Sequence, residues 1–356
     1  MRSAEIRLKV RGGEAMLLEV PDDRGGYTQV PVDPADVRRM YDGLTEALPG
    51  IYVLFEDPPE GEMSADLPYK TAVAMLSGRV PPDVLAALAG AAERTRGAAP
   101  PPLLIAENDP FPWELVRLTP ESRMLGQIFD VARFDGVCAE PEVRVSSILV
   151  IAPAPSATAI RCDVTQGTFA AQLNSVTSHF GGGRWDLLDC ETATRDETLA
   201  RLQGPDERVV HYMGHHFHDT VDPEQSWLQL AGGEGLTPRV VAELLGTSPT
   251  GPKWPWVFLN CCSGLAIHRK GVPFEDGEKQ WGTVLREAGA RATVGPYWRV
   301  EKSESFTPAA KFSQLVLEEG SSLGAAMRTI RMQPRPPTML AYTLVGDPTA
   351  RVTLGD

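Results

Sequence analysis

The chain has 356 residues, of which 42% are hydrophobic and 23% charged, a composition typical of a globular protein with two domains or one large one. Its net charge of −13, its pI of about 5.0 and the lack of any Lys/Arg cluster argue against a nucleic-acid partner. No apolar run reaches the ~18 residues of a membrane span, and the amino terminus has no signal-peptide core. We therefore expect a cytoplasmic protein that does not enter a membrane.

The first 140 residues are predicted to form a smaller α+β region. Residues 4–20 have the alternating pattern of a β-hairpin, with Gly12 and Gly13 at its turn. Three segments with helical spacing follow, and an apolar strand comes after a Pro-rich break. The predicted helices span residues 33–48, 68–76 and 82–96, and the predicted strand spans 103–106. A linker at 136–142 would separate this domain, residues 1–140, from the rest of the chain.

Residues 141–356 alternate regularly between predicted strands and helices. The strands span 145–152, 185–188, 209–213, 256–259, 292–296 and 340–345. The helices span 166–180, 195–203, 237–245, 280–288, 308–320 and 322–331. This alternation predicts an α/β domain with a mainly parallel sheet and helices on both of its faces.

One predicted strand leads directly into a pair of thiols. The apolar run 256–259 is typical of a strand buried on both faces, and Asn260, Cys261, Cys262, Ser263 and Gly264 follow it. Sheets of this class place their active sites at the carboxyl edge. Because neighbours on a strand point to opposite faces, we assign Cys261 to packing and Cys262 to a cleft. The alternative is that both are small buried side chains.

A base for the thiol is predicted from the strand at 209–213. Four of the six histidines (His211, His215, His216 and His218) lie in this strand or just after it. An imidazole activates a cysteine nucleophile by taking its proton, and we expect His215 to be this base. The backbone N–H groups of Gly214 and Cys262 are candidate donors for an oxyanion.

Other chemistries lack their sequence signatures. His211 and His215, with the two adjacent cysteines, are zinc-ligand residue types, but their spacing suits a helix and no Cys-x2-Cys pair accompanies them. A Gly-x-Ser-x-Gly match at 320–324 joins two predicted helices, whereas a nucleophile elbow follows a strand. The five cysteines are odd in number and irregularly spaced, which favours free thiols. We expect no metal and no cofactor.

These motifs together resemble those of CHAT-domain proteases, bacterial caspase-like cysteine peptidases related to separase. Val-Val-His-Tyr-Met-Gly-His-His (209–216) is similar to the family's histidine motif, and Phe-Leu-Asn-Cys-Cys-Ser-Gly (258–264) is similar to its Leu-Ser-Ala-Cys-Glu-Thr-Gly. Phe-Pro-Trp-Glu-Leu (111–115) and the segments 289–300, 317–326 and 344–348 also resemble family motifs. The resemblance covers residues 101–356, and residues 1–100 match less clearly.

The resemblance implies a caspase-like fold in which residues 1–140 complete a degenerate first half. It maps the catalytic histidine to His215. The family's cysteine falls on Cys261 when counted from Gly264, and on Cys262 by its place after two small or polar residues; we keep Cys262. It lies 47 residues after His215, similar to the His-first spacing in caspase-type proteases. His216 departs from the family pattern, which has Gly at this position.

The implied function is that of a cysteine endopeptidase that cleaves a specific protein partner through a Cys-His dyad, in bacterial defence or regulated cell death. A separate activating or regulatory protein is also implied. Related peptidases with Asp two residues before the nucleophile prefer basic P1 residues; here that residue is Asn260, and Tyr297 and Trp298 are expected to wall the substrate pocket. The alternatives are a catalytically silent CHAT-like scaffold protein and an acyltransferase that uses the same pair.

Overall fold

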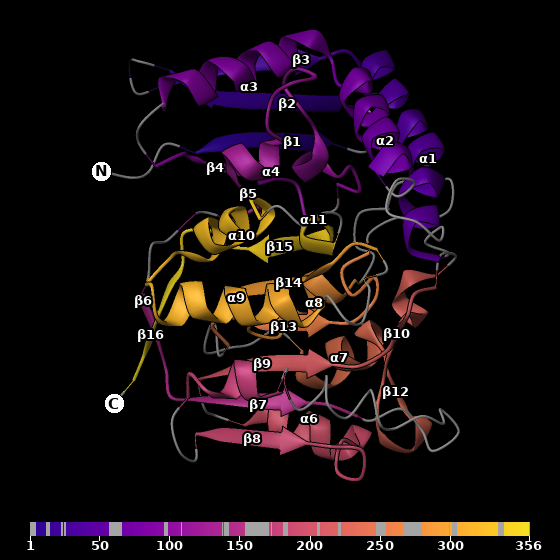
Figure 1. Cartoon of the computed structure of the whole chain (residues 1–356), viewed down its shortest axis with the longest axis vertical. Helices are drawn as coiled ribbons and strands as arrows, with labels where there is room; N and C mark the ends of the chain where they lie inside the picture. Colours follow the sequence, from indigo (N-terminus) through magenta and orange to yellow (C-terminus); the bar gives the residue numbers. More distant parts are fainter. Residues whose placement is uncertain are drawn as a thin grey trace.

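A single 11-stranded sheet organises the molecule, with the strand order β3-β2-β1-β4-β5-β15-β14-β13-β9-β7-β8 (Figure 1). This computed structural model describes residues 5–11, 15–22, 24, 26–56, 66–95, 99–107, 109–136, 138, 142–153, 171, 173–180, 184–204, 207–219, 222–246, 254–266, 280–298, 300, 305–333 and 338–355. The strands of the sheet are β1 (Ile6–Arg11), β2 (Ala15–Pro21), β3 (Tyr27–Val32), β4 (Pro102–Ile105), β5 (Asp130–Arg133), β7 (Ser147–Ile151), β8 (Trp185–Leu188), β9 (Arg208–Met213), β13 (Val257–Asn260), β14 (Ala292–Pro296) and β15 (Tyr342–Gly346).

The N-terminal strands form one end of this sheet. β1, β2 and β3 are antiparallel, and β1 continues the sheet through parallel pairing with β4, which pairs in parallel with β5. The predicted hairpin is confirmed, although its turn at Gly12 and Gly13 lies outside the described residues. Three helices accompany these strands: α1 (Pro34–Glu56), α2 (Asp66–Arg79) and α3 (Pro82–Arg94). α1 continues beyond its predicted end at residue 48 to Glu56 and includes five consecutive apolar residues at 51–55.

No single helix in the described part of the chain has the length and apolar composition of a membrane span. Two consecutive helical segments, Lys70–Arg79 and Pro82–Arg94, reach that length and composition only when taken together, and they are bent by 104° relative to each other.

The C-terminal strands form the other end of the sheet, and here the prediction of a mainly parallel α/β sheet is confirmed. β8, β7, β9, β13 and β14 are all parallel, whereas β15 is antiparallel to β14. The helices of this end are α6 (Arg195–Gln203), α7 (Pro238–Leu245), α8 (Trp281–Glu287), α9 (Phe306–Leu317) and α10 (Leu323–Arg331). The predicted helix at 166–180 lies mostly outside the described residues; 171 and 173–177 are helical.

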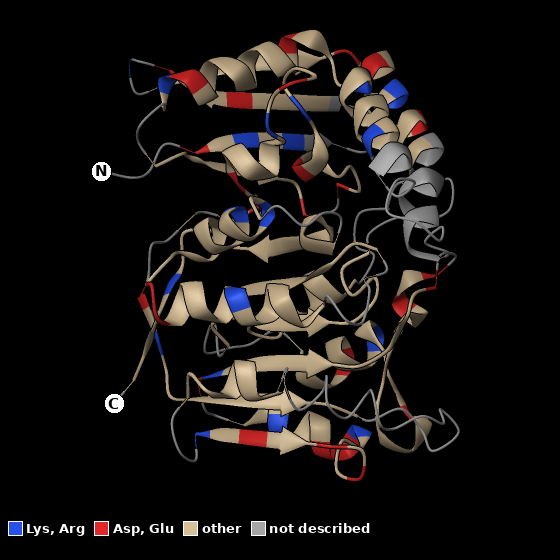
Figure 2. Ribbon diagram, viewed as in Figure 1, with Lys and Arg blue, Asp and Glu red and all other residues tan. Residues whose placement is uncertain are grey.

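Helices cover both faces of the sheet because successive side chains of the central strands point in opposite directions. Phe258 of β13 joins the core beneath α9 and α10, whereas its neighbours Val257 and Leu259 join the core beneath α6, α7 and α8. α9 and α10 lie on the side facing the viewer in Figure 1. β7, β13, β14 and β15 carry no charged residue, as Figure 2 shows and as burial on both faces requires.

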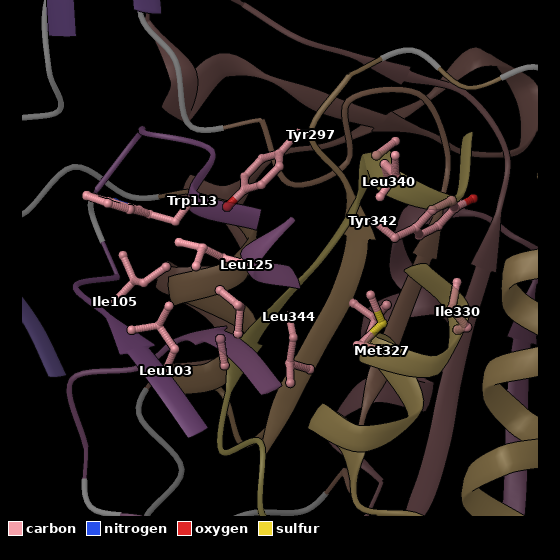
Figure 3. Close-up of a cluster of buried hydrophobic side chains, with 14 of the residues drawn as sticks. Leu103, Ile105, Trp113, Leu125, Tyr297, Met327, Ile330, Leu340, Tyr342 and Leu344 are labelled. Atoms are coloured by element: carbon pink, nitrogen blue, oxygen red, sulfur yellow. The ribbon is translucent and has the colours of Figure 1, made fainter. Parts of the chain in front are cut away.

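The two ends of the sheet share one core. β5 pairs in parallel with β15, where Arg133 is opposite Val345. Close to this junction, Trp113 and Leu103 from the N-terminal part lie in the same hydrophobic cluster as Leu344 from the C-terminal part (Figure 3). Strands from residues 6–133 and from 147–346 therefore occupy opposite ends of one continuous sheet, and the proposed domain boundary at residue 140 stays a prediction.

Two small sheets were not predicted from the sequence. β10 (His216–Phe217), β11 (Trp227–Gln229) and β12 (Gly235–Leu236) form an antiparallel sheet immediately after β9. β6 (Glu142–Val145) pairs in parallel with β16 (Arg351–Leu354). The three-stranded sheet supports the residues that leave the carboxyl end of β9, since the Gln229 N–H donates to the carbonyl of His215.

Candidate active site

The cysteine and histidine segments leave the large sheet side by side. β9 and β13 are adjacent parallel strands whose last paired residues are Met213 and Asn260, and their arrows end on the same side of the molecule (Figure 1). The Gly214 N–H donates to the carbonyl of Asn260 across 3.4 Å, which extends the pairing one step beyond the strands. The two strands are therefore neighbours, and the segments that follow them begin at one edge of the sheet.

The two neighbouring thiols have different surroundings. Cys261 is 3% exposed and packs with Leu259 and Leu265 in the core beneath α8. Burial raises the pKa of Cys261 well above its ordinary value, so this thiol stays protonated. Cys262 is only partly buried, and its thiol lies 3.7 Å from the carbonyl oxygen of Val300. This arrangement matches the sequence-based assignment of Cys261 to packing and leaves Cys262 as the accessible thiol of the pair.

A tight turn presents Cys262. Ser263, the next residue, has a left-handed φ of 53°, which is unfavourable by roughly 1–2 kcal/mol for a residue with a Cβ. Its N–H donates to the carbonyl of Trp298 at 3.1 Å. A Cβ on Gly264 would lie 2.9 Å from the sulfur of Cys261, so the turn needs glycine here for space. The sequence alone did not show that Ser263 is strained.

His215 lies on the surface just after β9, and hydrogen bonds to its backbone carbonyl hold the loop in place. Its carbonyl oxygen accepts from the Gln229 N–H at 2.9 Å and lies 2.7 Å from the Tyr212 hydroxyl. That hydroxyl also lies 2.8 Å from the carbonyl of Gln229. A Cβ on Gly214 would lie 2.5 Å from the Tyr212 hydroxyl oxygen. Gly214 therefore allows Tyr212 to connect the His215 loop to β11.

His216 reaches from the histidine segment to the cysteine turn. Its Nδ1 lies 3.1 Å from the carbonyl oxygen of Cys262. His216 is buried, with 9% of its surface exposed. Burial lowers the pKa of His216 to about 3, with a smaller contribution from His218 in the same direction. The ring of His218 lies 6.2 Å away, and its Nδ1 is 3.4 Å from the Ser226 hydroxyl. The sequence marked His216 only as a departure from the family pattern.

His211 belongs to the core. It is 1% exposed and stacks on Phe258 of β13 with 5.3 Å between ring centroids. Burial lowers its pKa to about 3, so the ring is neutral. The four histidines thus comprise a core residue, a surface residue, one residue that contacts the cysteine turn (His216) and one whose ring lies near that residue (His218). No group of three or more His, Cys, Asp or Glu side chains within the described ranges is arranged to hold a metal ion.

The three residues predicted to bind substrate are all buried, and they make different contacts. Asn260 is 6% exposed, and its Oδ1 accepts from the Tyr342 hydroxyl at 2.5 Å. Trp298 is buried and contacts the turn through its backbone carbonyl. Tyr297 is also buried: the guanidinium of Arg133 lies 4.5 Å from its ring centroid, and Figure 3 shows the ring directed at Trp113. Substrate-binding roles for Asn260, Tyr297 and Trp298 stay predictions.

The two predicted oxyanion donors also differ. The Gly214 N–H faces the Asn260 carbonyl at 3.4 Å, longer than the ~2.7–3.2 Å of most N–H···O bonds. The Cys262 N–H has no hydrogen-bond acceptor among the residues that the structure describes. Of the two N–H groups, that of Cys262 is therefore the more available to donate to an oxyanion.

A buried charged network lies behind the site. Glu114, in the short 3-10 helix Trp113–Leu115, is 1% exposed and bonds Arg133 at 2.6 Å, with Arg331 at 3.7 Å. The Thr343 hydroxyl also lies 2.6 Å from Glu114. Burial alone would raise the pKa of Glu114, but the two arginines outweigh it and hold that pKa below its ordinary value.

This network connects to Asn260 through one tyrosine. Arg331 donates to the carbonyl of Tyr342 at 3.0 Å through Nη2, and the hydroxyl of the same tyrosine reaches Asn260. Figure 3 shows the Tyr342 ring pointing away from Trp113, on the opposite side to Tyr297. The Pro-Trp-Glu-Leu segment is thus linked to the cysteine turn by contacts that span more than half of the chain.

Comparisons with known proteins identify the fold. No protein-family model matches the chain, and no curated protein sequence matches it. Its structure resembles the Arg-specific cysteine proteinase gingipain R of Porphyromonas gingivalis, with a TM-score of 0.50 and 14% identity over 77% of this chain and 69% of that one.

It also resembles separase from Saccharomyces cerevisiae in its complex with securin, with a TM-score of 0.57 and 12% identity. The match covers 97% of this chain but only 30% of the separase chain. Both relationships are structural, and they agree with the large mainly parallel sheet flanked by helices. The chain therefore has the caspase-like fold of these cysteine proteases.

Proposed function

We propose that the chain is a cysteine endopeptidase of the CHAT type, with Cys262 as nucleophile and His215 as general base. The observation that carries the proposal is that a partly exposed thiol, Cys262, and a surface imidazole, His215, each follow the carboxyl end of one of two paired parallel strands. Carboxyl ends of such strands are where α/β sheets place their sites. The caspase-like fold, which the chain shares with cysteine proteases, supports proteolysis.

In the proposed mechanism, His215 takes the proton of the Cys262 thiol and the thiolate attacks the carbonyl carbon of the scissile peptide bond. The carbon–nitrogen bond then breaks, His215 returns the proton to the leaving amine, and an acyl-enzyme remains on Cys262. Water hydrolyses this thioester with His215 as base. The N–H of Cys262 and, once its long bond to Asn260 opens, that of Gly214 would donate to the oxyanion.

We propose a protein substrate without a strict requirement for a basic P1 residue. The residue two before Cys262 is Asn260, whose amide supplies no negative charge, and its oxygen already accepts from Tyr342. A peptide library scanned at P1 tests this point. Cleavage after polar or medium-sized residues as well as Arg is expected, whereas cleavage after Asp alone would contradict the proposal.

We further propose that a separate protein regulates the enzyme in the cytoplasm, in bacterial defence or regulated cell death. The structure of separase with securin shows a protein complex for one structurally similar protein. The purified chain alone would then cleave its target slowly. Full activity of the isolated chain on that target would argue against a required activator.

The central experiment maps new protein N-termini by mass spectrometry after the full chain is added to a cell extract from its source. Cys262→Ala and His215→Ala are expected to abolish the new termini, while Cys261→Ala, the matched control at the neighbouring thiol, retains them. Undiminished cleavage by Cys262→Ala would refute the nucleophile assignment.

A second measurement separates the enzyme from a silent scaffold. A thiolate formed with the help of His215 reacts with iodoacetamide much faster than ordinary thiols at neutral pH. Cys262 is therefore expected to be alkylated well before Cys138, Cys190 and Cys261, and His215→Ala should slow it. Equal rates for Cys262 and the exposed Cys190 would favour the scaffold.

A further inference from the structure

The residue after the proposed base makes a direct contact with the residue that carries the proposed nucleophile. His216 begins β10, opposite Leu228 of β11, and its side chain crosses to the cysteine turn. Its Nδ1 lies 3.1 Å from the carbonyl oxygen of Cys262, 46 residues away in the chain. The two loops of the candidate site are thus joined by one side chain.

The contact determines where the proton of this imidazole is. A carbonyl oxygen only accepts, so Nδ1 carries the hydrogen and donates it to Cys262. In the neutral ring Nε2 is then the bare nitrogen, and it is buried with no hydrogen-bond partner within the described residues. A buried polar atom without a hydrogen-bond partner is unfavourable. An apolar side chain would avoid this cost but would supply no donor for Cys262.

The contact also immobilises one particular peptide group. The Cys262–Ser263 peptide is held at both polar atoms: His216 binds its C=O, and the carbonyl of Trp298 binds its N–H. This peptide is strained, because Ser263 adopts φ 53°. Rotation of the peptide plane would change ψ of Cys262 and φ of Ser263 together and relieve the strain. The two hydrogen bonds oppose that rotation.

We propose that His216 is a positioning residue that locks the Cys262–Ser263 peptide in its strained orientation and thereby sets the placement of the Cys262 thiol relative to His215. The roles of Cys262 and His215 in this inference rest on the proposed function; the locking itself does not. Because His216 is the immediate neighbour of His215, the same hydrogen bond ties the base's loop to the nucleophile's loop.

Two variants of His216 separate the hydrogen bond from the volume of the ring. His216→Asn keeps an N–H donor close to the Nδ1 position, and His216→Leu keeps an apolar volume without a donor. His211→Leu is the matched control, since His211 is also buried, stacks on Phe258 and has an Nε2 without a partner among the described residues, but makes no contact there with the cysteine turn.

The readout is the rate of Cys262 alkylation by iodoacetamide against pH, followed by peptide mass spectrometry on the folded full chain. His216→Leu is expected to lower the rate at neutral pH by on the order of 10- to 100-fold and to move the profile towards higher pH. His216→Asn should restore most of the rate. His211→Leu should lower the melting temperature without changing the profile. Identical profiles for wild type and His216→Leu would overturn the inference.

A second measurement does not depend on the variants folding. The ¹⁵N chemical shifts of the His216 ring in the wild-type chain report its tautomer directly. A protonated Nδ1 supports the hydrogen bond to Cys262, and a protonated Nε2 overturns it. If the wild-type chain cleaves no protein while the alkylation and NMR results hold, the proposed function fails and the locking role of His216 stands. If His216→Leu cleaves protein at the wild-type rate, the proposed function stands and the locking role of His216 fails.

Discussion

The hydroxyl of Tyr342 donates a 2.5 Å hydrogen bond to Oδ1 of Asn260, and this bond joins β15 to the end of β13 across the intervening strand β14. Both residues are buried. Asn260 immediately precedes the two cysteines, so the core on the β15 side directly supports the candidate site.

Removing this hydrogen bond should destabilise the chain. Tyr342→Phe leaves the Asn260 oxygen buried without this donor, and the free energy of unfolding is expected to fall by about 1–3 kcal/mol in urea denaturation. In a double-mutant cycle, Tyr342→Phe combined with Asn260→Leu should be less destabilising than the sum of the two single changes. Tyr27→Phe, at a residue 48% exposed on β3, is the control and should change stability by less than ~0.5 kcal/mol. Additive effects at Tyr342 and Asn260 would contradict the coupling.

Neutralising Glu114 should be among the most damaging single changes. Glu114→Gln removes the carboxylate that balances Arg133 and Arg331, both fully buried, and unpaired buried charges destabilise by about 3–5 kcal/mol. Urea denaturation of the full chain measures the loss. Glu243→Gln, which breaks an exposed pair with Arg239, is the matched control and should lower stability by at most ~1 kcal/mol. Equal effects at the two glutamates would show that the buried network is not needed for stability.

A methyl group at Gly214 should disturb the His215 loop. The added Cβ would lie 2.5 Å from the Tyr212 hydroxyl oxygen, which must move away from the carbonyls of His215 and Gln229. We expect Gly214→Ala to lower the free energy of unfolding by about 1–3 kcal/mol and to slow cleavage, measured with the same substrate as the wild type.

The control for this change is Gly78→Ala in α2. No atom lies within 4 Å of a Cβ at Gly78, and alanine in a helix interior stabilises by roughly 0.5–1 kcal/mol relative to glycine. If Gly214→Ala proved as harmless as Gly78→Ala, Tyr212 would not need its present position.

Two buried histidines should make the fold sensitive to acid. The pKa values of His211 and His216 are both lowered to about 3 by burial, against about 6.5 in an unfolded chain. Between these values the unfolded state binds the proton and the folded state does not. Stability is therefore complete above about pH 6.5 and falls as the pH drops towards 3, by up to ~1.4 kcal/mol per pH unit for each histidine.

The measurement compares urea denaturation of the wild type and His211→Phe from neutral pH to about pH 4. The variant lacks one of the two groups, so its stability should fall less steeply with acid, by up to ~1.4 kcal/mol per pH unit. Parallel pH profiles would mean that His211 is protonated equally in both states and would contradict its burial as a neutral ring.

The sequence by itself determined most helices and strands and the two strand ends that carry reactive residues. Apolar runs and helical spacing are local signals, and β8, α6 and β14 match their predicted limits residue for residue. α7 begins after Thr237, whose side chain accepts from the Val240 N–H, so its start was also encoded locally. Two adjacent cysteines after one strand and four clustered histidines indicated the chemistry.

Only the tertiary structure decided how these pieces meet. The antiparallel insertion of β15 between β5 and β14, the bond from Tyr342 to Asn260 and the bond from His216 to Cys262 are contacts between residues far apart in the chain. A strand of two residues such as β10 is too short to show a period. Which histidine lies on the surface and which contacts the cysteine turn depends on how the strand ends pack, because burial and hydrogen bonding at an edge are set by neighbouring segments and not by the local sequence.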